Sequence, residues 1–398
     1  MSQPRSYDVV IAGGGVIGLL LARLLTELRC GADALRIAVI EPDPPMPVSD
    51  ESLDLRVSAL SPASLQMLDS VGCLARVPAH AQCAFDTMRV WQNGDGPEND
   101  HAICFSAAQA GAAELGRIVE NRSVRAVLWS LLEEDGRCDL LQAELTALTE
   151  RAGDMQLQLT NGVAHTRLLI GADGAASPVR ELLGIRSREI TYGENALVAH
   201  LQPALPHQAT AWQKFLPGGP AALLPLADGR VSLVWSHPED DTEHLLALDD
   251  QEFAARLTRE LDGVLGELSC TTARAVFPLC SAHAERYTGR RFALVGDAAH
   301  RIHPLAGQGA NLGMRDVAAL SSELREFLRQ PLADPGDPRM LRRYERSRKG
   351  DNALTLRTMQ GLDGLFTSGL AELAGAGMGM VDRSPLLKSM LARYAMGG

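Results

Sequence analysis

The sequence predicts an α/β protein of 398 residues, in which a parallel-sheet domain is interleaved with an antiparallel-sheet domain and followed by a helical tail. Three observations support this class. A short apolar run near the N-terminus leads into a glycine-rich turn and an apolar helix. Two later segments repeat the order of strand, turn and helix. Shorter alternating runs, separated by turn residues, lie between those two segments and are typical of antiparallel strands.

Composition excludes several classes of protein. The formal net charge of −11 and the aromatic content of 4% offer neither a basic field nor a stacking surface for nucleic acid. Seven scattered cysteines form no Cys-x-x-Cys pair, which indicates reduced thiols in a cytoplasmic protein. The polar leader leaves no room for a signal peptide, and no apolar run reaches the ~18 residues of a membrane span. We therefore expect a soluble chain that can still touch the inner face of a membrane.

The first element is the apolar run from Val9 to Ala12, which reads as a buried parallel strand. Gly13, Gly15 and Gly18 follow it as Gly-x-Gly-x-x-Gly and open an apolar helix that continues to Leu28. Gly13 permits the tight turn, Gly15 lets the backbone approach a pyrophosphate, and Gly18 lets helix and strand pack closely.

A second strand, "LRIAVIE", ends in Glu41, where a carboxylate can accept hydrogen bonds from ribose hydroxyls. Strand, glycine turn, helix and terminal acid together predict a Rossmann-like dinucleotide site. The acid favours FAD or NAD over NADP, because it would repel a 2′-phosphate. This end of the chain alone does not separate FAD from NAD.

The next strand, Arg167 to Ile170, leads into Asp173-Gly174. Ser177 then reads as a helix N-cap, with Pro178 at the first helical position. Two interpretations stay open for this segment. It is either a well-capped connection or a second part of the cofactor site.

The third strand, Phe292 to Val295, ends in Gly296-Asp297, and a new helix is expected from about Gly309 or Ala310. His300 and His303 in the intervening loop have a spacing that suggests metal ligands. No third ligand lies nearby, and Pro304 disfavours the helix that such a pair usually needs, so we expect no metal.

A flavin explains this segment better. Asp297 can bond a ribityl hydroxyl, and the backbone from Gly307 to Asn311 can approach the flavin ring and point amides at its N1–C2=O edge. The dipole of the following helix would stabilise negative charge on a reduced flavin.

These three segments, in this order, resemble the class A flavin monooxygenases, the group typified by para-hydroxybenzoate hydroxylase. "HPLAGQGANLGMRD" and "DLRVSALSPASLQMLDSVG" are more narrowly similar to the ubiquinone-biosynthesis hydroxylases, which act on polyprenyl phenols. The matching segments extend from residue 8 to residue 397, and they also include "LGRIVEN", "GGPAALLPLADGRVSLVWS" and "VDRSPLLKSMLARYAMG".

The resemblance implies a role for each matching position. The ADP half of FAD would lie on Gly13, Gly15, Gly18 and Glu41. Arg56 would lie near the cofactor, and Arg117 would contact its ribose or pyrophosphate. Asp173 would sit at the middle of the flavin, and Asp297 at the ribityl chain. His303 and Pro304 would border the C4a side of the ring as the candidate catalytic residues. The residues expected to flank the isoalloxazine are Pro304, Gly307, Gln308, Gly309, Ala310 and Asn311, where Ala310 is smaller than the family pattern suggests.

The predicted division of the chain is discontinuous. Residues 1–79, 106–181 and 287–350 would form the FAD-binding domain, residues 80–105 and 182–286 the substrate-binding sheet domain, and residues 351–398 a helical region. Asp249 to Leu261 reads as an amphipathic helix over the sheet. Clustered arginines from Arg339 to Arg348 read as a solvated helix face or as a contact for anionic lipid or an acidic partner. The apolar, glycine-broken tail beyond them could lie at a membrane interface or on a partner.

The function that the resemblance implies is FAD-dependent hydroxylation of a polyprenyl phenol with O2, by way of a flavin C4a-hydroperoxide. NAD(P)H is the expected electron donor. No second Gly-x-Gly-x-x-Gly occurs downstream, so a transient nicotinamide site and a reductase partner both stay open. Two alternatives remain: a class A monooxygenase for a small soluble aromatic, or a flavin-bearing scaffold among other ubiquinone-biosynthesis proteins. The ring position, the prenyl length and the oligomeric state are left open.

Overall fold

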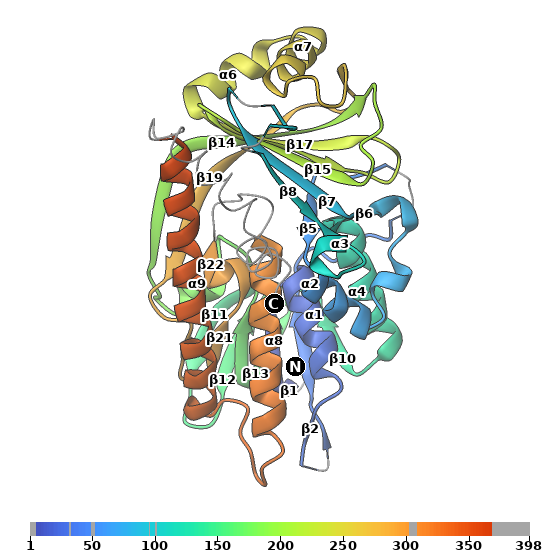
Figure 1. Ribbon diagram of the computed structural model, residues 1–398. Helices are drawn as coiled ribbons and strands as arrows, with labels where there is room; N and C mark the ends of the chain where they lie inside the picture. The colour runs from blue at the N-terminus through green and yellow to red at the C-terminus, as the bar shows by residue number, and fades with distance from the viewer. Residues whose placement is uncertain are drawn as a thin grey trace.

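The computed structural model describes residues 5–31, 33–48, 52–94, 96–99, 102–301 and 309–367, with side chains up to residue 352. It confirms the predicted α/β class. A mixed sheet with helices on its faces forms the lower part of the molecule, and an antiparallel sheet lies above it with α6 and α7 across its outer face (Figure 1).

The lower sheet has a parallel core in the order β10-β4-β1-β13-β21. The chain moves outward from β1 to β4 and β10, and then returns to the other side of β1 with β13. This reversal opens a crevice at the carboxyl ends of β1 and β13, the usual ligand site of such sheets. The strands of this sheet are β1 (Arg5–Ala12), β4 (Ile37–Ile40), β10 (Cys138–Leu141), β11 (Leu145–Glu150), β12 (Met155–Leu159), β13 (Gly162–Gly171), β20 (Thr288–Gly289) and β21 (Phe292–Leu294).

Helix α1 (Val16–Leu25) follows β1 as predicted, and it contacts both α4 (Asn121–Asp135) and α8 (Gly309–Phe327). It ends three residues before Leu28, the predicted end. The Thr26 hydroxyl donates a 2.8 Å bond to the carbonyl of Arg23, and the Leu28 amide bonds Leu25. These contacts tighten the last turn and stop the helix.

A small sheet in the order β5-β9-β6 stands between the two halves. The Ser61 hydroxyl caps α2 with Pro62 at its first position. The elements of this region are β5 (Val57–Leu60), α2 (Pro62–Ser70), η1 (Leu74–Arg76), η2 (Ala79–Ala81), β6 (Gln82–Phe85), α3 (Ala107–Ala110) and β9 (Gly116–Glu120). In the lower part, β2 (Arg29–Cys30) and β3 (Asp33–Ala34) form a separate two-stranded sheet, and α5 (Pro178–Leu182) contacts β11.

The upper sheet runs β22-β19-β14-β17-β16-β15-β7-β8, and β18 pairs with β14. Neighbours are antiparallel except β15 and β7, which are parallel. This confirms the antiparallel strands predicted in the middle of the chain. The strands are β7 (Thr87–Gln92), β8 (Ile103–Ser106), β14 (Ser187–Pro203), β15 (Thr210–Leu216), β16 (Gly219–Pro225), β17 (Val231–Pro238), β18 (Leu268–Cys270), β19 (Ala275–Ala284) and β22 (His300–Arg301).

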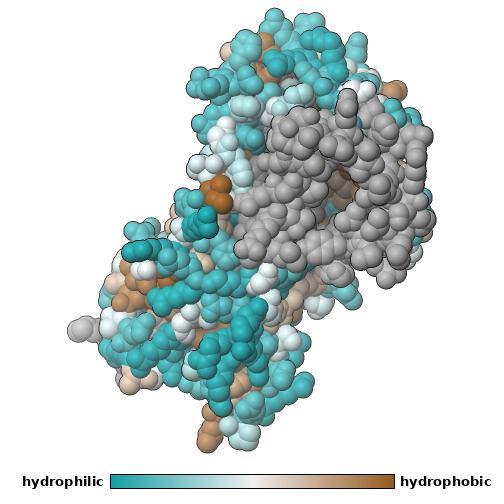
Figure 2. Space-filling view, turned by 60° about the vertical axis from the view of Figure 1, so that its left-hand side comes forward, coloured by the Kyte–Doolittle hydropathy of each residue, from teal (hydrophilic) through white to brown (hydrophobic). Residues whose placement is uncertain are grey.

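Both faces of the upper sheet are covered. Leu197, Leu223 and Trp235 point outward and pack with residues of α6 (Glu239–Ala247) and α7 (Asp250–Glu260). The alternate residues point inward, where Ala222 and Leu224 pack against the small sheet. Helix α7 is the amphipathic helix predicted from residue 249, with the carboxylate of Asp249 as its N-cap. On the face shown in Figure 2, the surface at the top of the molecule is largely hydrophilic.

Helix α9 (Pro338–Thr367) lies beside α8 and crosses residue 350, where the sequence predicted a boundary. Strand β22 also lies in a stretch assigned to the lower domain, yet it pairs with β19 of the upper sheet. Residues 368–398, which hold the expected tail helix, are outside the described residues. Among the helices described, none combines the length and the apolar character needed to cross a bilayer.

Part of the predicted basic face of α9 is engaged within the protein, whereas Arg339, Arg342 and Arg346 are exposed as expected for a solvated face. Arg348 is buried, Arg343 binds Glu323 at 2.7 Å, and the Lys349 ammonium donates to the carbonyl of Glu285. These contacts account for side chains that the sequence placed on a solvated face.

One buried titratable group makes the upper sheet sensitive to acid. His200 in β14 has no exposed surface, and burial lowers its pKa to about 4, with Arg230 acting in the same direction and Asp228, Asp54 and Glu120 opposing it. A histidine whose folded pKa is depressed gives stability that is present above its unfolded pKa and is lost as pH falls towards the folded value. The shift from 6.5 to about 4 corresponds to at most about 3 kcal/mol.

We predict that His200→Leu reduces the loss of stability between pH 7 and pH 4.5, measured by urea unfolding. Neither ring nitrogen has a partner among the described residues, so leucine removes an unmet polar group at pH 7. His244→Leu, at an exposed position on α6, is the matched control and should keep the wild-type pH dependence. If the wild type and His200→Leu lost the same free energy of unfolding between pH 7 and pH 4.5, His200 would not be the group that causes the acid sensitivity.

Candidate functional site

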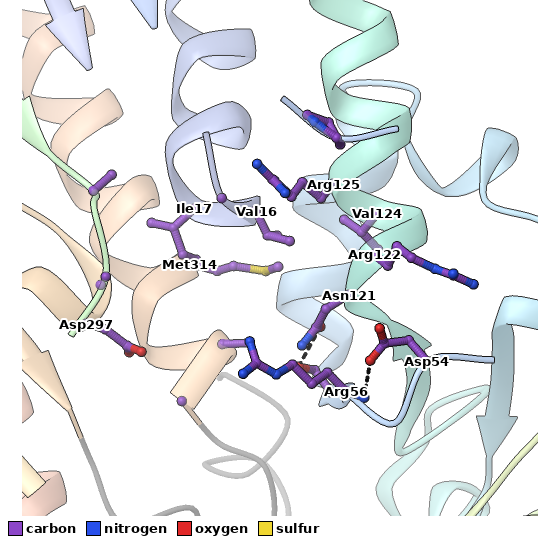
Figure 3. Close-up of a pocket in the computed structure, with 18 of the residues that line it drawn as sticks. Val16, Ile17, Asp54, Arg56, Asn121, Arg122, Val124, Arg125, Asp297 and Met314 are labelled. Carbon is purple, nitrogen blue, oxygen red and sulfur yellow. Dashed lines mark hydrogen bonds between the residues drawn. The ribbon is translucent and has the colours of Figure 1, made fainter. Parts of the chain in front are cut away.

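A cavity of about 820 Å³ opens at the carboxyl ends of β1 and β13. Its walls come from α1, α4, α8, β5, the segment after β4 and the turn of Asp297, and Figure 3 shows how the labelled residues of these different elements lie around it. The lining residues are Gly15, Val16, Ile17, Asp43, Pro44, Pro45, Met46, Pro47, Val48, Asp54, Arg56, Ser58, Leu60, Asn121, Arg122, Val124, Arg125, Ala172, Gly174, Val295, Gly296, Asp297, Gly309, Ala310 and Met314.

The three glycines of the first turn serve different purposes. Gly13 has φ +110°, and a Cβ there would lie 2.3 Å from the carbonyl oxygen of Ala172. A Cβ on Gly18 would lie 2.0 Å from the carbonyl oxygen of Gly13. Backbone packing therefore excludes any side chain at these two positions. Gly15 lines the cavity, and a Cβ there would meet nothing within 4 Å.

The N-terminus of α1 has the features of an anion site. Gly15 is its N-cap, and among the described residues no side chain bonds the first-turn amides. Helix N-termini with free amides bind phosphate groups. The open space over Gly15 is therefore where a pyrophosphate fits.

Arg125 of α4 completes this end of the site. Its Nε donates a 2.7 Å bond to the carbonyl of Gly14, and its guanidinium lies 3.4 Å from Glu41. Glu41 in turn accepts a 2.6 Å bond from the amide of Gly14. Glu41 thus secures the glycine turn, and it is not among the described residues that line the cavity. Its predicted contact with ribose stays a prediction.

Sequence reasoning missed Arg122 and Arg125. Both lie on α4 and line the cavity from one face. Their spacing of three residues, directly after the matching segment "LGRIVEN", was the available signal, because residues i and i+3 share a helix face.

Arg56 stands at the other side of the cavity. Its amide donates to Asp54 at 2.7 Å, and its carbonyl accepts a 3.1 Å bond from the amide of Asn121 (Figure 3). Its guanidinium lies over the ring of Phe277, 5.3 Å from the centroid. The backbone is therefore held while the charged group reaches the upper sheet.

Asp297 lies in the turn η3 (Gly296–Ala298). Asp297 lines both cavities and keeps exposed surface towards them, although its neighbours Gly296 and Ala298 are buried. Burial raises its pKa, while His300 and Arg301 act in the opposite direction. The placement suits a carboxylate that bonds a hydroxyl of a bound cofactor.

A buried charge network stands behind this turn. Asp316 of α8 is fully buried, and it accepts a 2.9 Å bond from the amide of Gly296 and a 2.8 Å bond from Nε of Arg348. Nε2 of His300 lies 2.5 Å from the same carboxylate. Burial alone would raise the pKa of Asp316, but His300 and Arg348 hold it below its ordinary value.

The Asp173 segment is both a capped connection and a cavity wall. The Asp173 carboxylate accepts bonds from the Ser177 hydroxyl at 2.5 Å and from the Val179 amide at 2.8 Å. The Ser177 hydroxyl caps the next helix as predicted. Gly174 lines the cavity, and Arg180 bonds the carbonyl of Ala298 at 3.0 Å, beside Asp297. Both carboxylate oxygens of Asp173 thus hold its own turn.

Two predicted cofactor residues lie elsewhere. The Arg117 guanidinium bonds Glu114 at 2.9 Å and Gln82 at 2.8 Å, and Arg117 is not among the described residues that line the cavity. Asn311 is buried, and its amide oxygen accepts from the Ser61 amide at 2.9 Å, which ties α8 to α2.

Helix α8 begins at Gly309, as predicted, and Gly309 and Ala310 line the cavity. His303, Pro304, Gly307 and Gln308 lie outside the described residues, so their predicted places beside the flavin ring stay predictions.

A second cavity of about 320 Å³ lies directly above the first, under the inner face of the upper sheet. Most of its wall is apolar, from β14, β16, β17 and β19. It shares Arg56, Asn121, Asp297 and Gly309 with the first cavity. Its lining residues are Leu55, Arg56, Val57, Asn121, Ala196, Val198, Gln213, Pro220, Ala222, Leu224, Val234, Ser236, Phe277, Pro278, Leu279, Asp297, Arg301 and Gly309.

The residues present fit an FAD molecule. The open glycine turn suits the pyrophosphate, the arginines of α4 suit its charge, and Asp297 with the start of α8 suits the flavin half. Such a cavity at the switch point of the lower sheet, beneath a second, apolar one, is typical of flavoproteins of the dinucleotide-binding α/β class.

The chain belongs to the FAD binding domain family, whose model matches residues 6–356. It is 37% identical to ubiquinone hydroxylase UbiL of Rhodospirillum rubrum, over 100% of this chain and 91% of that protein. It is 34% identical to 3-demethoxyubiquinol 3-hydroxylase of Escherichia coli, over 100% of this chain and 99% of that protein. PqsL of P. aeruginosa, solved in complex with 2-aminobenzoylacetate, has a TM-score of 0.77 and 24% identity over 94% of this chain and 99% of its own. The family and the curated relatives make this chain an FAD-dependent monooxygenase.

We predict that Gly15→Ala folds normally and binds FAD much more weakly. The added methyl meets no protein atom, and φ of −76° suits alanine, but the methyl occupies the space kept for the pyrophosphate. Apoprotein melting temperature and FAD titration by fluorescence separate the two effects.

Gly18→Ala is the matched comparison, because its methyl would collide with backbone at 2.0 Å. It should lower the melting temperature of the apoprotein as well as FAD binding. Wild-type FAD affinity in Gly15→Ala would show that the phosphate lies elsewhere.

We also predict that Asp316→Asn lowers the free energy of unfolding by about 3 kcal/mol, because it leaves the buried Arg348 guanidinium with the partly exposed Asp351 as its one remaining carboxylate partner among the described residues. Chemical denaturation measures this. Glu134→Gln, in an exposed pair with Arg76, is the control and should cost about 1 kcal/mol or less. Equal small losses in both variants would refute the importance of the network.

Proposed function

We propose that this chain hydroxylates the aromatic ring of a prenylated phenol or quinol in ubiquinone biosynthesis. One atom of O2 enters a ring C–H bond, the other leaves as water, and NAD(P)H supplies the two electrons. Two curated relatives whose names state hydroxylation of ubiquinone or of a ubiquinol precursor align over the whole chain, which supports this substrate class.

The observation that carries the proposal is the shared wall between the two cavities. Arg56, Asn121, Asp297 and Gly309 line both, so a ring bound under the upper sheet meets the flavin end of the cofactor without crossing solvent. Reaction requires that the two partners be held close and oriented, which this junction provides.

Bound FAD supplies the redox chemistry and the activation of O2. The protein supplies the surroundings. The α1 amides and Arg125 would hold the phosphates, Asp297 would accept a hydrogen bond from the ribityl chain, and the start of α8 would lie beside the flavin. The apolar side chains of Val198, Leu224 and Val234 exclude water from the ring.

Two cations border the second cavity. The guanidinium groups of Arg56 and Arg301 both line it. Positive charge favours the ionised form of a phenol bound between them. The phenolate is the more electron-rich ring and therefore the better acceptor of an electrophilic oxygen.

The second cavity suits the head of the substrate. A volume of about 320 Å³ lies at the low end of the ~300–1,000 Å³ of small-molecule sites, enough for a substituted ring. A tail of several prenyl units would extend beyond it. Contact of the protein with a membrane surface, or with other ubiquinone-biosynthesis proteins, would deliver such a substrate.

The test uses purified holoprotein with NADH or NADPH, ¹⁸O2 and a prenylphenol, with products analysed by mass spectrometry. We expect one ¹⁸O atom per product molecule and none with Gly15→Ala lacking FAD. A short phenol without a prenyl tail, assayed in parallel, tests the soluble-aromatic alternative. Formation of hydrogen peroxide alone with every phenol, with either nicotinamide and with an added flavin reductase, would overturn the proposal.

A further inference from the structure

Gln213 of β15 is a buried amide without a partner. Its exposed fraction is 6%, and no group in the described part of the chain bonds its side chain. Buried polar groups in proteins are nearly always hydrogen-bonded, because an unmet amide in an apolar surrounding costs free energy. The amide atoms of Gln213 keep accessible surface, so their partner can come from the space that they face.

The direction of the side chain is settled by its neighbours. Trp212 packs with the outer cluster under α7, and the Lys214 ammonium bonds the carbonyl of Glu260 at 2.8 Å, also on the outer side. Successive residues of a strand point to opposite faces. Gln213 therefore points inward, where it lines the second cavity.

The surroundings of this amide are apolar on the sheet. Its cross-strand partners are Ala222 of β16 and Val90 of β7, and Ala222 pairs onward with Val234 of β17. A second group points the same way, because Ser236 of β17 is buried, lines the cavity and has no side-chain bond within the described chain. The inner face of the upper sheet thus presents two polar side chains, Gln213 and Ser236, to the second cavity, and their neighbours on the sheet are apolar.

The floor of the same cavity is the junction with the cofactor cavity, at Arg56, Asp297 and Gly309. A planar ring between roof and floor has one edge near the sheet amide and another near the flavin end. An oxygen substituent that bonds Gln213 or Ser236 of the sheet therefore decides which ring carbon faces the junction with the cofactor cavity.

We propose that the Gln213 carboxamide binds an oxygen substituent of the substrate ring and so selects the ring carbon that is hydroxylated, with the Ser236 hydroxyl as a second contact. A carboxamide can donate to a phenol, quinol or methoxy oxygen and can accept from a hydroxyl. It does not ionise, so its role is positioning and not proton transfer. This inference rests on the proposed function and specifies which group of the substrate is recognised.

The first experiment measures binding, independently of turnover. Holoprotein is titrated with a prenylphenol and with the corresponding prenylbenzene, which lacks the oxygen, and the change in flavin absorbance reports each Kd. We expect Gln213→Leu to weaken binding of the prenylphenol about tenfold, the effect of one neutral hydrogen bond of ordinary strength. Binding of the prenylbenzene should be unchanged or tighter, because leucine removes an unmet amide.

The second experiment measures the reaction. Gln213→Leu should produce less hydroxylated product per O2 consumed and a mixture of ring positions, while Gln213→Asn, which keeps the amide, should restore part of the selectivity. Ser236→Ala should have the same effect on a smaller scale. Gln202→Leu, at an exposed position on β14, is the matched control and should behave as the wild type.

The outcomes separate the two proposals. If the wild type hydroxylates no phenol, the proposed function fails, whatever Gln213 does. If the wild type is active and Gln213→Leu keeps the wild-type Kd, coupling and product, with normal FAD content and melting temperature, the role of Gln213 is refuted. Equal weakening for prenylphenol and prenylbenzene would also refute it, because it would indicate a deformed cavity and not a lost hydrogen bond.

Discussion

The buried carboxylate of Asp316 is the interaction on which the site depends. It joins the amide of Gly296, the ring of His300 and the guanidinium of Arg348, which belong to separate elements. A buried charge is tolerated only when its partners neutralise and hydrogen-bond it. The need to satisfy this one group therefore holds α8, α9 and the turn of Asp297 in one arrangement, and that turn faces both cavities.

Around this anchor, the site is assembled by segments that are remote in the chain. The glycine turn is held by Glu41 and Arg125, the Asp173 turn is held by its own carboxylate and by Arg180, and Asn311 ties the start of α8 to α2. In each case a side chain with several hydrogen-bonding groups stiffens a backbone turn. The cavity surface itself is then mostly backbone, small residues and a few charges, which suits a long, polar cofactor.

The upper sheet divides its two faces between stability and recognition. The outward residues form a compact apolar layer with α6 and α7. The inward residues leave a cavity that Val198, Val234 and Asp297 help to line, and they include polar side chains that no other described residue bonds. Since an apolar core needs no such groups, their placement indicates a ligand that supplies the missing bonds.

The sequence by itself determined the features whose cause is local. The Gly18 position and the Ser177 and Asp249 caps follow from contacts within a few residues, and the start of α8 and the alternating strands follow from local sequence pattern. Only the tertiary structure decided which charged and polar side chains reach the site. Arg117 bonds its own neighbours whereas Arg125 enters the cavity, and the partners of Asn311 lie about 250 residues away. Residue type and spacing do not specify such directions, because packing between distant segments sets them.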